Sequence, residues 1–200
     1  MMALVLGVSM AATSFCDLTI FTPTAKKLRT NQASVTLLTL PSRDYAFGWA
    51  GLGLSDFWEV SVTGENLDSS SLILSGNLSY HYLIPIVDVS PGIALGVIDV
   101  ADETEDRRAF YAAFTFHFGN IGTLNQDVPT EFTLGMWSRK EGFMFFGAKL
   151  PVTSQFKLVA EHDANRFNSG IEFSPISEAT FKYYFRAGSP MFGLTVQKRF

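Results

Sequence analysis

The sequence contains one cysteine, few charged residues and no long apolar run, and each shortage excludes a class of protein. Cys16 alone cannot form an internal disulfide, and no cysteine–histidine spacing resembles a zinc site. A net charge of −4 without any dense basic run gives nucleic acid nothing to bind. The stretch that comes nearest to a membrane helix, residues 69–87, is interrupted by Gly76, Asn77 and Pro85.

Charged residues make up only 17% of the chain, whereas an average soluble domain has about 25%. Many of these charges lie in turns, above all in "DETEDRR" at 102–108 and "RKE" at 139–141. A soluble sandwich or a lipocalin-like barrel needs charged side chains along most of its outward positions. The scarcity of charge therefore favours a barrel with apolar side chains on lipid and polar ones in the lumen.

Runs of alternating polarity, separated by short turn-forming clusters, fill the chain from residue 32 onward. Short connections between such runs force neighbouring strands to be antiparallel, and an even number of strands closes without edges. The sequence therefore predicts an all-β, up-and-down antiparallel transmembrane β-barrel of about 12 strands. The expected strands are Gln32–Leu40, Tyr45–Leu54, Trp58–Asn66, Ser71–Leu83, Ser90–Asp99, Arg108–Phe118, Thr130–Ser138, Gly142–Leu150, Gln155–Asp163, Phe167–Ser174, Ala179–Arg186 and Met191–Phe200.

The length of these runs also suits a membrane, because strands of about ten residues cross a bilayer at a tilt whereas soluble strands are usually nearer five or six. Aromatic residues lie near the ends of several runs, where an aromatic girdle meets the membrane surface. They include Tyr45, Trp58, Tyr80, Tyr82 and Phe118. We expect the protein in a bacterial outer membrane.

The first residues, "MMALVLGVSMAATS", are apolar and end in small residues. We interpret residues 1–15 as an export signal, although a positively charged start is missing, and the alternative is a buried N-terminal strand. Phe15 disfavours lipidation of Cys16, because a lipoprotein signal has a small residue at that position. Residues 16–31 are expected to form a periplasmic lead-in, and residues 32–200 the barrel.

Charges on the strands must face the lumen if the exterior is apolar. Turn lengths place Lys157 opposite Glu172, and Glu172 opposite Lys182, in one row across three strands. We also expect Glu161 and Asp163 near Arg186, with Arg199 at the opposite rim. Three interpretations remain open: a structural ladder of ion pairs, a charged constriction for small solutes, and a binding site for a polar polymer.

Enzyme and metal motifs are not evident. His81, His117 and His162 lie on separate predicted strands, and neither a nucleophile elbow nor an HExxH motif occurs. We therefore predict no enzyme activity, no metal site and no cofactor. A membrane-embedded hydrolase that recruits Ser79 or Ser138 is kept as a weaker alternative. The acidic residues at 102–106 are expected to form a solvated loop rather than a calcium site.

Residues 156–200, "FKLVAEHDANRFNSGIEFSPISEATFKYYFRAGSPMFGLTVQKRF", resemble the closing hairpins of YjbH-type outer-membrane barrels. The similar elements are an "AE-D" strand (160–163), an "FN-GI-F-P" strand (167–175) and a glycine-bearing last strand that ends in phenylalanine. "FTPTA" at 21–25, followed by "DYAFGWAGLGLSDFWEVSV" at 44–62, is similar to the start of such barrels. The resemblance implies an outer-membrane barrel associated with exopolysaccharide production.

The terminal Phe200 is the kind of residue that the barrel assembly machinery reads in its clients, although Lys198 departs from that signal. Expected partners are outer-membrane lipids, the assembly machinery, and polysaccharide or other envelope proteins. The leading functional hypothesis is a narrow passive pore or an exopolysaccharide-associated accessory protein. The alternative is a scaffold subunit that anchors a partner complex in the membrane.

Overall fold

The computed structural model describes residues 18–41, 45–66, 72–103, 108–119, 128–139 and 142–200. Within them the chain is all-β, as predicted, and the strand boundaries lie within about two residues of those expected from alternation and turn chemistry. The strands are β1 (Gln32–Leu40), β2 (Tyr45–Gly53), β3 (Trp58–Asn66), β4 (Ile73–Leu83), β5 (Gly92–Ile98), β6 (Ala109–Phe118), β7 (Thr130–Trp137), β8 (Met144–Pro151), β9 (Phe156–His162), β10 (Phe167–Ile176), β11 (Ala179–Arg186) and β12 (Ser189–Arg199).

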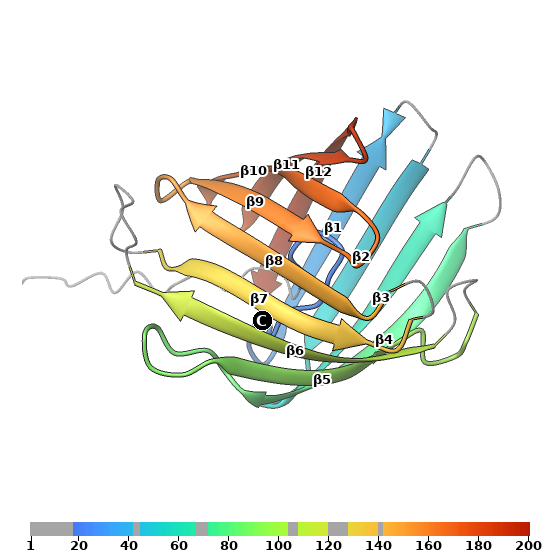
Figure 1. Cartoon of the computed structure of the whole chain (residues 1–200), viewed down its shortest axis with the longest axis horizontal. Helices are drawn as coiled ribbons and strands as arrows, with labels where there is room; N and C mark the ends of the chain where they lie inside the picture. Colours follow the sequence, from blue (N-terminus) through green and yellow to red (C-terminus); the bar gives the residue numbers. More distant parts are fainter. Residues whose placement is uncertain (1–17, 42–44, 67–71, 104–107, 120–127, 140–141) are drawn as a thin grey trace, which may run out of the picture.

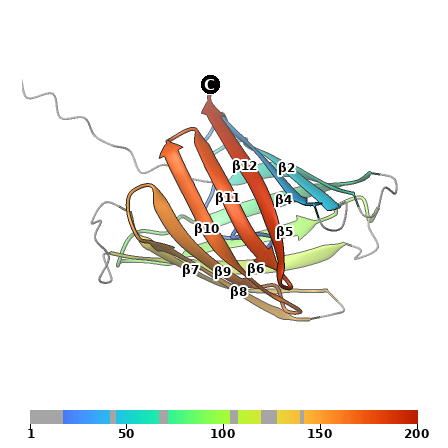
Figure 2. The same ribbon diagram turned by 90° about the horizontal axis from the view of Figure 1, so that it is seen from above.

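Each strand pairs antiparallel with its neighbours in sequence, and β1 closes the ring by pairing with β12 (Figures 1 and 2). The closing register runs from Gln32 opposite Arg199 to Thr39 opposite Phe192. The predicted meander and its closure are thus confirmed. Closure removes both sheet edges, which is a requirement for any sheet that meets hydrocarbon rather than water.

The two faces of the wall have opposite polarity. Along β1, Val35 and Leu37 are exposed on the outside, whereas Ser34 and Thr36 are buried inside. Polar and charged residues outnumber hydrophobic ones among the fully buried side chains of the described residues. This arrangement inverts that of a soluble barrel and agrees with a membrane-facing exterior. None of the helices that the structure describes is long and apolar enough to cross a membrane.

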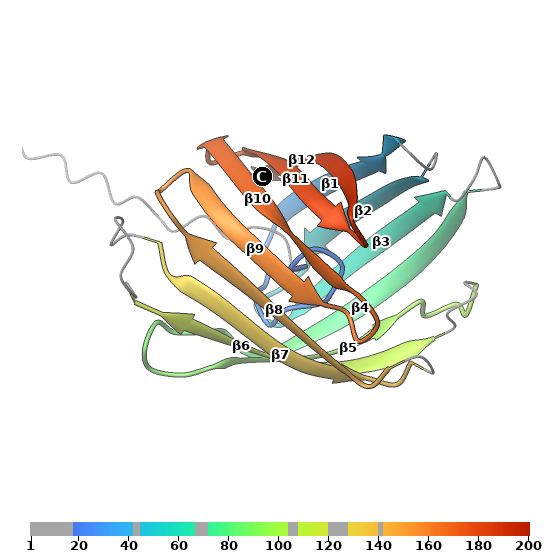
Figure 3. The ribbon, with the colours of Figure 1, turned by 45° about the horizontal axis from the view of Figure 1, so that its top comes forward.

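Residues 18–31, which we call the plug segment, lie inside the barrel, although the sequence led us to expect a periplasmic lead-in (Figures 1 and 3). The segment begins with a tight turn in which the Thr19 amide donates to the Thr22 carbonyl at 2.9 Å. The segment ends at Asn31, whose amide donates to the Gly53 carbonyl at 2.9 Å and whose φ is 61°. The plug segment is polar enough to lie in a polar lumen, because four of its residues are threonine.

A glycine on β8 makes room for this segment. A Cβ atom at Gly147 would lie 2.5 Å from the Thr19 hydroxyl oxygen, so a larger residue here would push the plug segment away from the wall by a few tenths of an ångström. Gly170 on β10 has a similar role in the wall. A Cβ atom there would lie 2.1 Å from the Tyr183 carbonyl oxygen and 2.6 Å from the Tyr184 ring.

We predict that Gly170→Ala destabilises the barrel by about 1–3 kcal/mol, because the added methyl group meets backbone that cannot move freely. The control is Gly76→Ala on β4, where a Cβ atom would meet nothing within 4 Å. Replacing that strand glycine should be neutral or should stabilise the fold by about 0.5–1 kcal/mol. Urea titration of the folded protein in detergent micelles measures both effects, and equal stability of the two variants would contradict the steric argument.

Candidate functional site

Glu161 on β9 is the main attachment point of the plug segment. Its Oε2 atom accepts hydrogen bonds from the backbone amides of Ile20, Phe21 and Thr22 at 2.8–2.9 Å, and from the Thr22 hydroxyl at 2.9 Å. The tight turn at Thr19–Thr22 aims these amides at one point. Its Oε1 atom accepts from the Asn168 side chain at 3.1 Å. Hydrogen bonds to a charged group contribute about 1.5–3 kcal/mol each, so this carboxylate holds the segment firmly.

The middle of the segment is held at Ala25. Its amide donates to the Thr115 hydroxyl at 2.8 Å, and its carbonyl faces His81 Nδ1 at 3.3 Å. A carbonyl only accepts, so Nδ1 carries the hydrogen and Nε2 accepts from the Ser79 hydroxyl at 3.0 Å. The sequence did not indicate this Ser79–His81 pair as a unit. Alternation along β4 puts both on the inner face, where they lie buried against the plug segment.

Lysines surround two buried glutamates in the lumen. Glu131 pairs with Lys26 of the plug segment at 2.6 Å and with Lys157 at 3.8 Å. Glu172 pairs with Lys149 at 3.3 Å and Lys182 at 4.0 Å, and it accepts a hydrogen bond from Tyr184. The pairing register places Glu172 opposite both Lys157 and Lys182, which is the row derived from turn lengths. Lys149 also donates to the Leu18 carbonyl at 3.2 Å, so this cluster too contacts the plug segment.

The last part of the segment is attached near the β2–β3 turn. The Lys27 amino group donates to the carbonyls of Leu28 and Ser55 at 2.7 and 2.6 Å. The Leu28 amide donates to Glu59 Oε2 at 2.8 Å. Burial lowers the pKa of Lys27, and the negative charges of Glu59 and Asp56 partly offset this shift. Since three glutamates of the wall each hold a donor of the segment, its attachment is distributed along the lumen.

An arginine lies over Phe21, close to the start of the plug segment. The guanidinium of Arg186 lies 4.6 Å from the Phe21 ring centre and 4.9 Å from that of Tyr45. Phe21 also makes an edge contact with Phe47 at 5.2 Å. We expected Glu161 and Asp163 near Arg186. Glu161 and Arg186 lie on either side of Asn168, and both contact Phe21, the carboxylate through the Phe21 amide and the guanidinium through its ring. Asp163 accepts from the amides of the β9–β10 turn at 165 and 166.

Two other predicted residues lie at the opposite end of the barrel. Arg199 pairs with Gln32 in the closing register and is exposed. The Phe200 amide donates to the Asn31 carbonyl at 2.9 Å, and its side chain is 77% exposed. Neither residue contributes to the charge cluster around Glu131 and Glu172. The role of Phe200 in assembly stays a prediction.

The two remaining histidines have separate environments. His117 lies opposite Glu131 in the β6–β7 register, within the lumen. His162 stacks on Phe146 of the neighbouring strand, with ring centres 5.2 Å apart and an interplanar angle of 10°. Among the described residues no group of three or more histidine, cysteine, aspartate or glutamate side chains is arranged to hold a metal ion.

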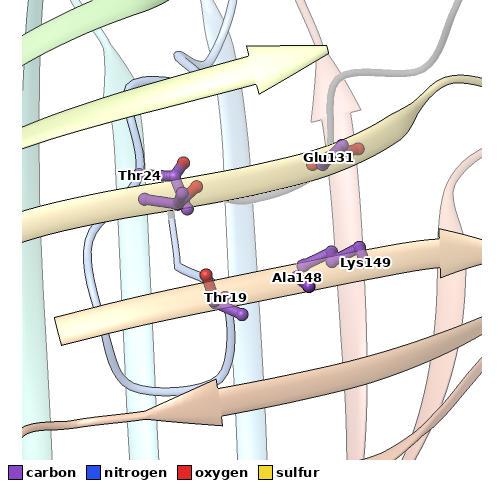
Figure 4. A pocket seen from close by; sticks show the side chains of 7 residues that line it. Thr19, Thr24, Glu131, Ala148 and Lys149 are labelled. Atoms are coloured by element: carbon purple, nitrogen blue, oxygen red, sulfur yellow. The ribbon is translucent and has the colours of Figure 1, made fainter. Parts of the chain in front are cut away.

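The plug segment packs against the wall beside the lumen charges. The space between the segment and the wall, lined by Thr19, Thr24, Glu131, Thr133 and Lys149 among others, is too small for a water molecule (Figure 4). Figure 4 shows Thr19 and Thr24 of the segment facing β7 and β8, which carry Glu131 and Lys149. The lumen charges are therefore covered by the protein's own chain rather than by solvent.

Known structures share this architecture at low sequence identity. The chain is similar to a structure described as the KdgM porin, with a TM-score of 0.56, 9% identity, and coverage of 84% of this chain and 99% of that one. Two other structures are less similar, each with a TM-score of 0.47 and with 84% of this chain covered. One is described as the NanC porin, at 7% identity and with 98% of that chain covered. The other is the Acinetobacter baumannii outer membrane protein Omp33, at 8% identity and with 97% of that chain covered. No family model and no curated protein matches the sequence.

The first of these likenesses agrees with the fold derived from the residues. A closed barrel of neighbouring antiparallel strands, apolar outside and polar inside, is the architecture of bacterial outer-membrane proteins. The chain is therefore an outer-membrane β-barrel.

We predict that Glu161→Ala loosens the start of the plug segment. Two buried amides and one partly buried amide lose their common acceptor, which costs about 1–3 kcal/mol for each unsatisfied buried group. Hydrogen exchange at Ile20, Phe21 and Thr22 should accelerate by roughly 10- to 100-fold. The control Thr180→Ala removes a buried lumen hydroxyl that pairs with Ser174 at 2.9 Å. Unchanged exchange in the Glu161 variant would show that this carboxylate does not hold the segment.

Proposed function

We propose that the protein is an outer-membrane pore that its own N-terminal segment closes, and that small polar solutes pass when this segment is displaced. The observation that carries the proposal is the position of residues 18–31 inside a lumen that is otherwise lined by polar and charged side chains. A barrel that served only as an anchor has no need of a buried charged interior, because buried charges are costly to keep.

Displacement of the segment is physically accessible because the barrel wall is complete without it. The ladder between β1 and β12 closes the ring, and the segment adds no strand to that ring. Its hydrogen bonds and ion pairs to the wall are contacts that water can replace once the lumen is hydrated. Exchanging one neutral protein hydrogen bond for a bond to water costs about 0.5–1.5 kcal/mol, and each bond to the Glu161 carboxylate about 1.5–3 kcal/mol, so the bonds at Glu161 set most of the cost of displacement.

Sugars fit the lining that such a movement would expose. Pairs of hydroxyl groups line the inner wall, including Thr36 with Thr195 at 2.7 Å and Thr115 with Thr133 at 2.9 Å. These groups donate and accept hydrogen bonds, as sugar hydroxyls do. Together with the resemblance to YjbH-type barrels, this supports a role in moving carbohydrate linked to exopolysaccharide production.

The filled lumen also favours the second candidate, a scaffold subunit whose barrel never opens. Apolar contacts contribute to the hold on the segment, since Ile20 and Leu28 are fully or almost fully buried against the wall. In a scaffold the plug segment is a permanent part of the core. A pore and a scaffold therefore differ in whether residues 18–31 move while the protein is folded.

A reversible disulfide between the segment and the wall tests this difference. In a Cys16→Ser background, Thr19→Cys and Gly147→Cys place two sulfurs on positions whose Cβ atoms would be 3.0 Å apart. Natural disulfides need roughly 3.5–4.5 Å, so the plug segment must move outward by about half an ångström to form this bond. The oxidised protein in planar bilayers should stay closed, and reduction should restore current steps. The control pair, Thr36→Cys with Thr195→Cys, links β1 to β12 within the wall and should leave the current unchanged. Absence of current in both the oxidised and the reduced protein would favour the scaffold.

Uptake of sugars by liposomes tests the proposed class of solute. Vesicles that contain the Glu161→Ala variant should swell at least tenfold faster in a neutral oligosaccharide than vesicles with the native protein, because the segment is released more often. Thr180→Ala serves as the matched variant. Swelling in solutions of small salts but not in oligosaccharides would support a pore and contradict the proposal that its solute is carbohydrate.

A further inference from the structure

The charged side chains of the plug segment are all basic. They are Lys26, Lys27 and Arg29, and the segment has no acidic residue. The buried charged side chains of the strands have the opposite balance, with four glutamates against three lysines. The glutamates are Glu59, Glu131, Glu161 and Glu172. Displacement of the segment therefore removes positive charge from the lumen and leaves the wall with more buried carboxylates than amines.

The other charges on the strands do not remove this excess. Glu65 and Arg186 are half-buried and add one charge of each sign. Lys198 and Arg199 are exposed at the end of β12, where water and salt screen them. The charge of an open lumen is therefore decided by the buried carboxylates that lose a partner when the segment moves.

Glu161 is the carboxylate that loses most. Its Oε2 atom accepts from three amides and one hydroxyl of the plug segment at 2.8–2.9 Å. Its partner on the wall is the Asn168 amide group, which is neutral. In the part of the chain that the structure describes, no ion pair joins Glu161 to a lysine or an arginine. Once the segment has moved, this charge faces the lumen without a counter-charge.

Two further glutamates lose a partner in the same movement. Glu131 lies 2.6 Å from the Lys26 amino group and 3.8 Å from that of Lys157, so its closer counter-charge belongs to the segment. Glu59 accepts from the Leu28 amide at 2.8 Å. The surroundings of both carboxylates therefore become more negative when the segment leaves.

The lysines of the wall, in contrast, keep their carboxylates. Lys149 and Lys182 lie 3.3 and 4.0 Å from Glu172, and Lys157 pairs with Glu131. All five residues belong to strands, and the ring of strands is complete without the segment. Movement of the segment thus exposes carboxylates, while each of these three lysines retains a negative partner.

We propose that the open lumen selects cations, and that Glu161 is the residue that sets this selectivity. The inference rests on the proposed function, since it concerns the pore after the plug segment has moved. Carboxylates that line a pore attract cations and repel anions. A barrel of twelve strands is narrow enough for such charges to act across its lumen. Cationic and neutral solutes are then admitted, and acidic sugars are disfavoured.

The zero-current potential of single openings in planar bilayers, across a gradient of dilute potassium chloride, tests the proposal. Openings of the native protein should favour potassium over chloride about tenfold, which is the effect of one carboxylate about 6 Å from a passing ion in water. Glu161→Gln keeps an oxygen acceptor but removes the charge, and it should bring the permeability ratio close to one. Glu161→Asp keeps the charge and should keep the preference for potassium.

The control Thr22→Ala removes a donor of the plug segment and leaves every charge of the wall in place. This variant should open more often than the native protein with the same preference for potassium. The frequency of opening thus reports the hold on the segment, whereas the zero-current potential reports the charge of the lumen. Gel mobility before and after heating checks that every variant is folded.

The possible failures are distinguishable. Native openings that favour chloride, or that show no preference, would overturn the selectivity while keeping the pore. An unchanged preference for potassium in the Glu161→Gln variant would overturn the role of Glu161. Absence of openings in the native protein and in all three variants would reject the pore, and this inference with it.

Discussion

The structure depends on one constraint: inside a bilayer every backbone amide and carbonyl must find a partner within the protein. The twelve strands meet it only because β1 pairs with β12 and leaves no open edge. Once the ring is closed, alternation of side chains decides the rest. Every second residue faces lipid and must be apolar, and the others enter a lumen that no longer has to be hydrophobic.

A polar lumen creates a second demand, because glutamate and lysine side chains that leave water need partners. The wall meets part of this demand with cross-strand pairs such as Glu172 with Lys182. The plug segment meets much of the rest, since Glu161 and Glu131 bond to its amides and to Lys26. The same contacts that satisfy the wall therefore keep the plug segment in the lumen. This link between charge satisfaction and closure is why displacement of one segment would change the lumen along its whole length.

Periodicity and turn chemistry were sufficient to predict the strands, because each depends on neighbours only a few residues away. Gln32–Leu40 and Trp58–Asn66 occur at the predicted boundaries. The row of Lys157, Glu172 and Lys182 follows from turn lengths, since a short hairpin fixes which residues face each other. Local pattern gave no such guide for residues 18–31, which make no strand pairing with the barrel. Their contacts lie from about 30 positions away, as between Leu28 and Glu59, to about 140, as between Thr22 and Glu161.

The sequence by itself determined the inverted polarity, the number of strands and their order, because each follows from a repeat of two and from short connections. Only the tertiary structure decided what occupies the lumen, that Ser79 and His81 hold Ala25, and that Glu161 bonds to amides of the plug segment. These features arise where distant segments meet in space. A closed ring brings together residues from all twelve strands, and their relative heights are set by the shear of the barrel rather than by any local signal.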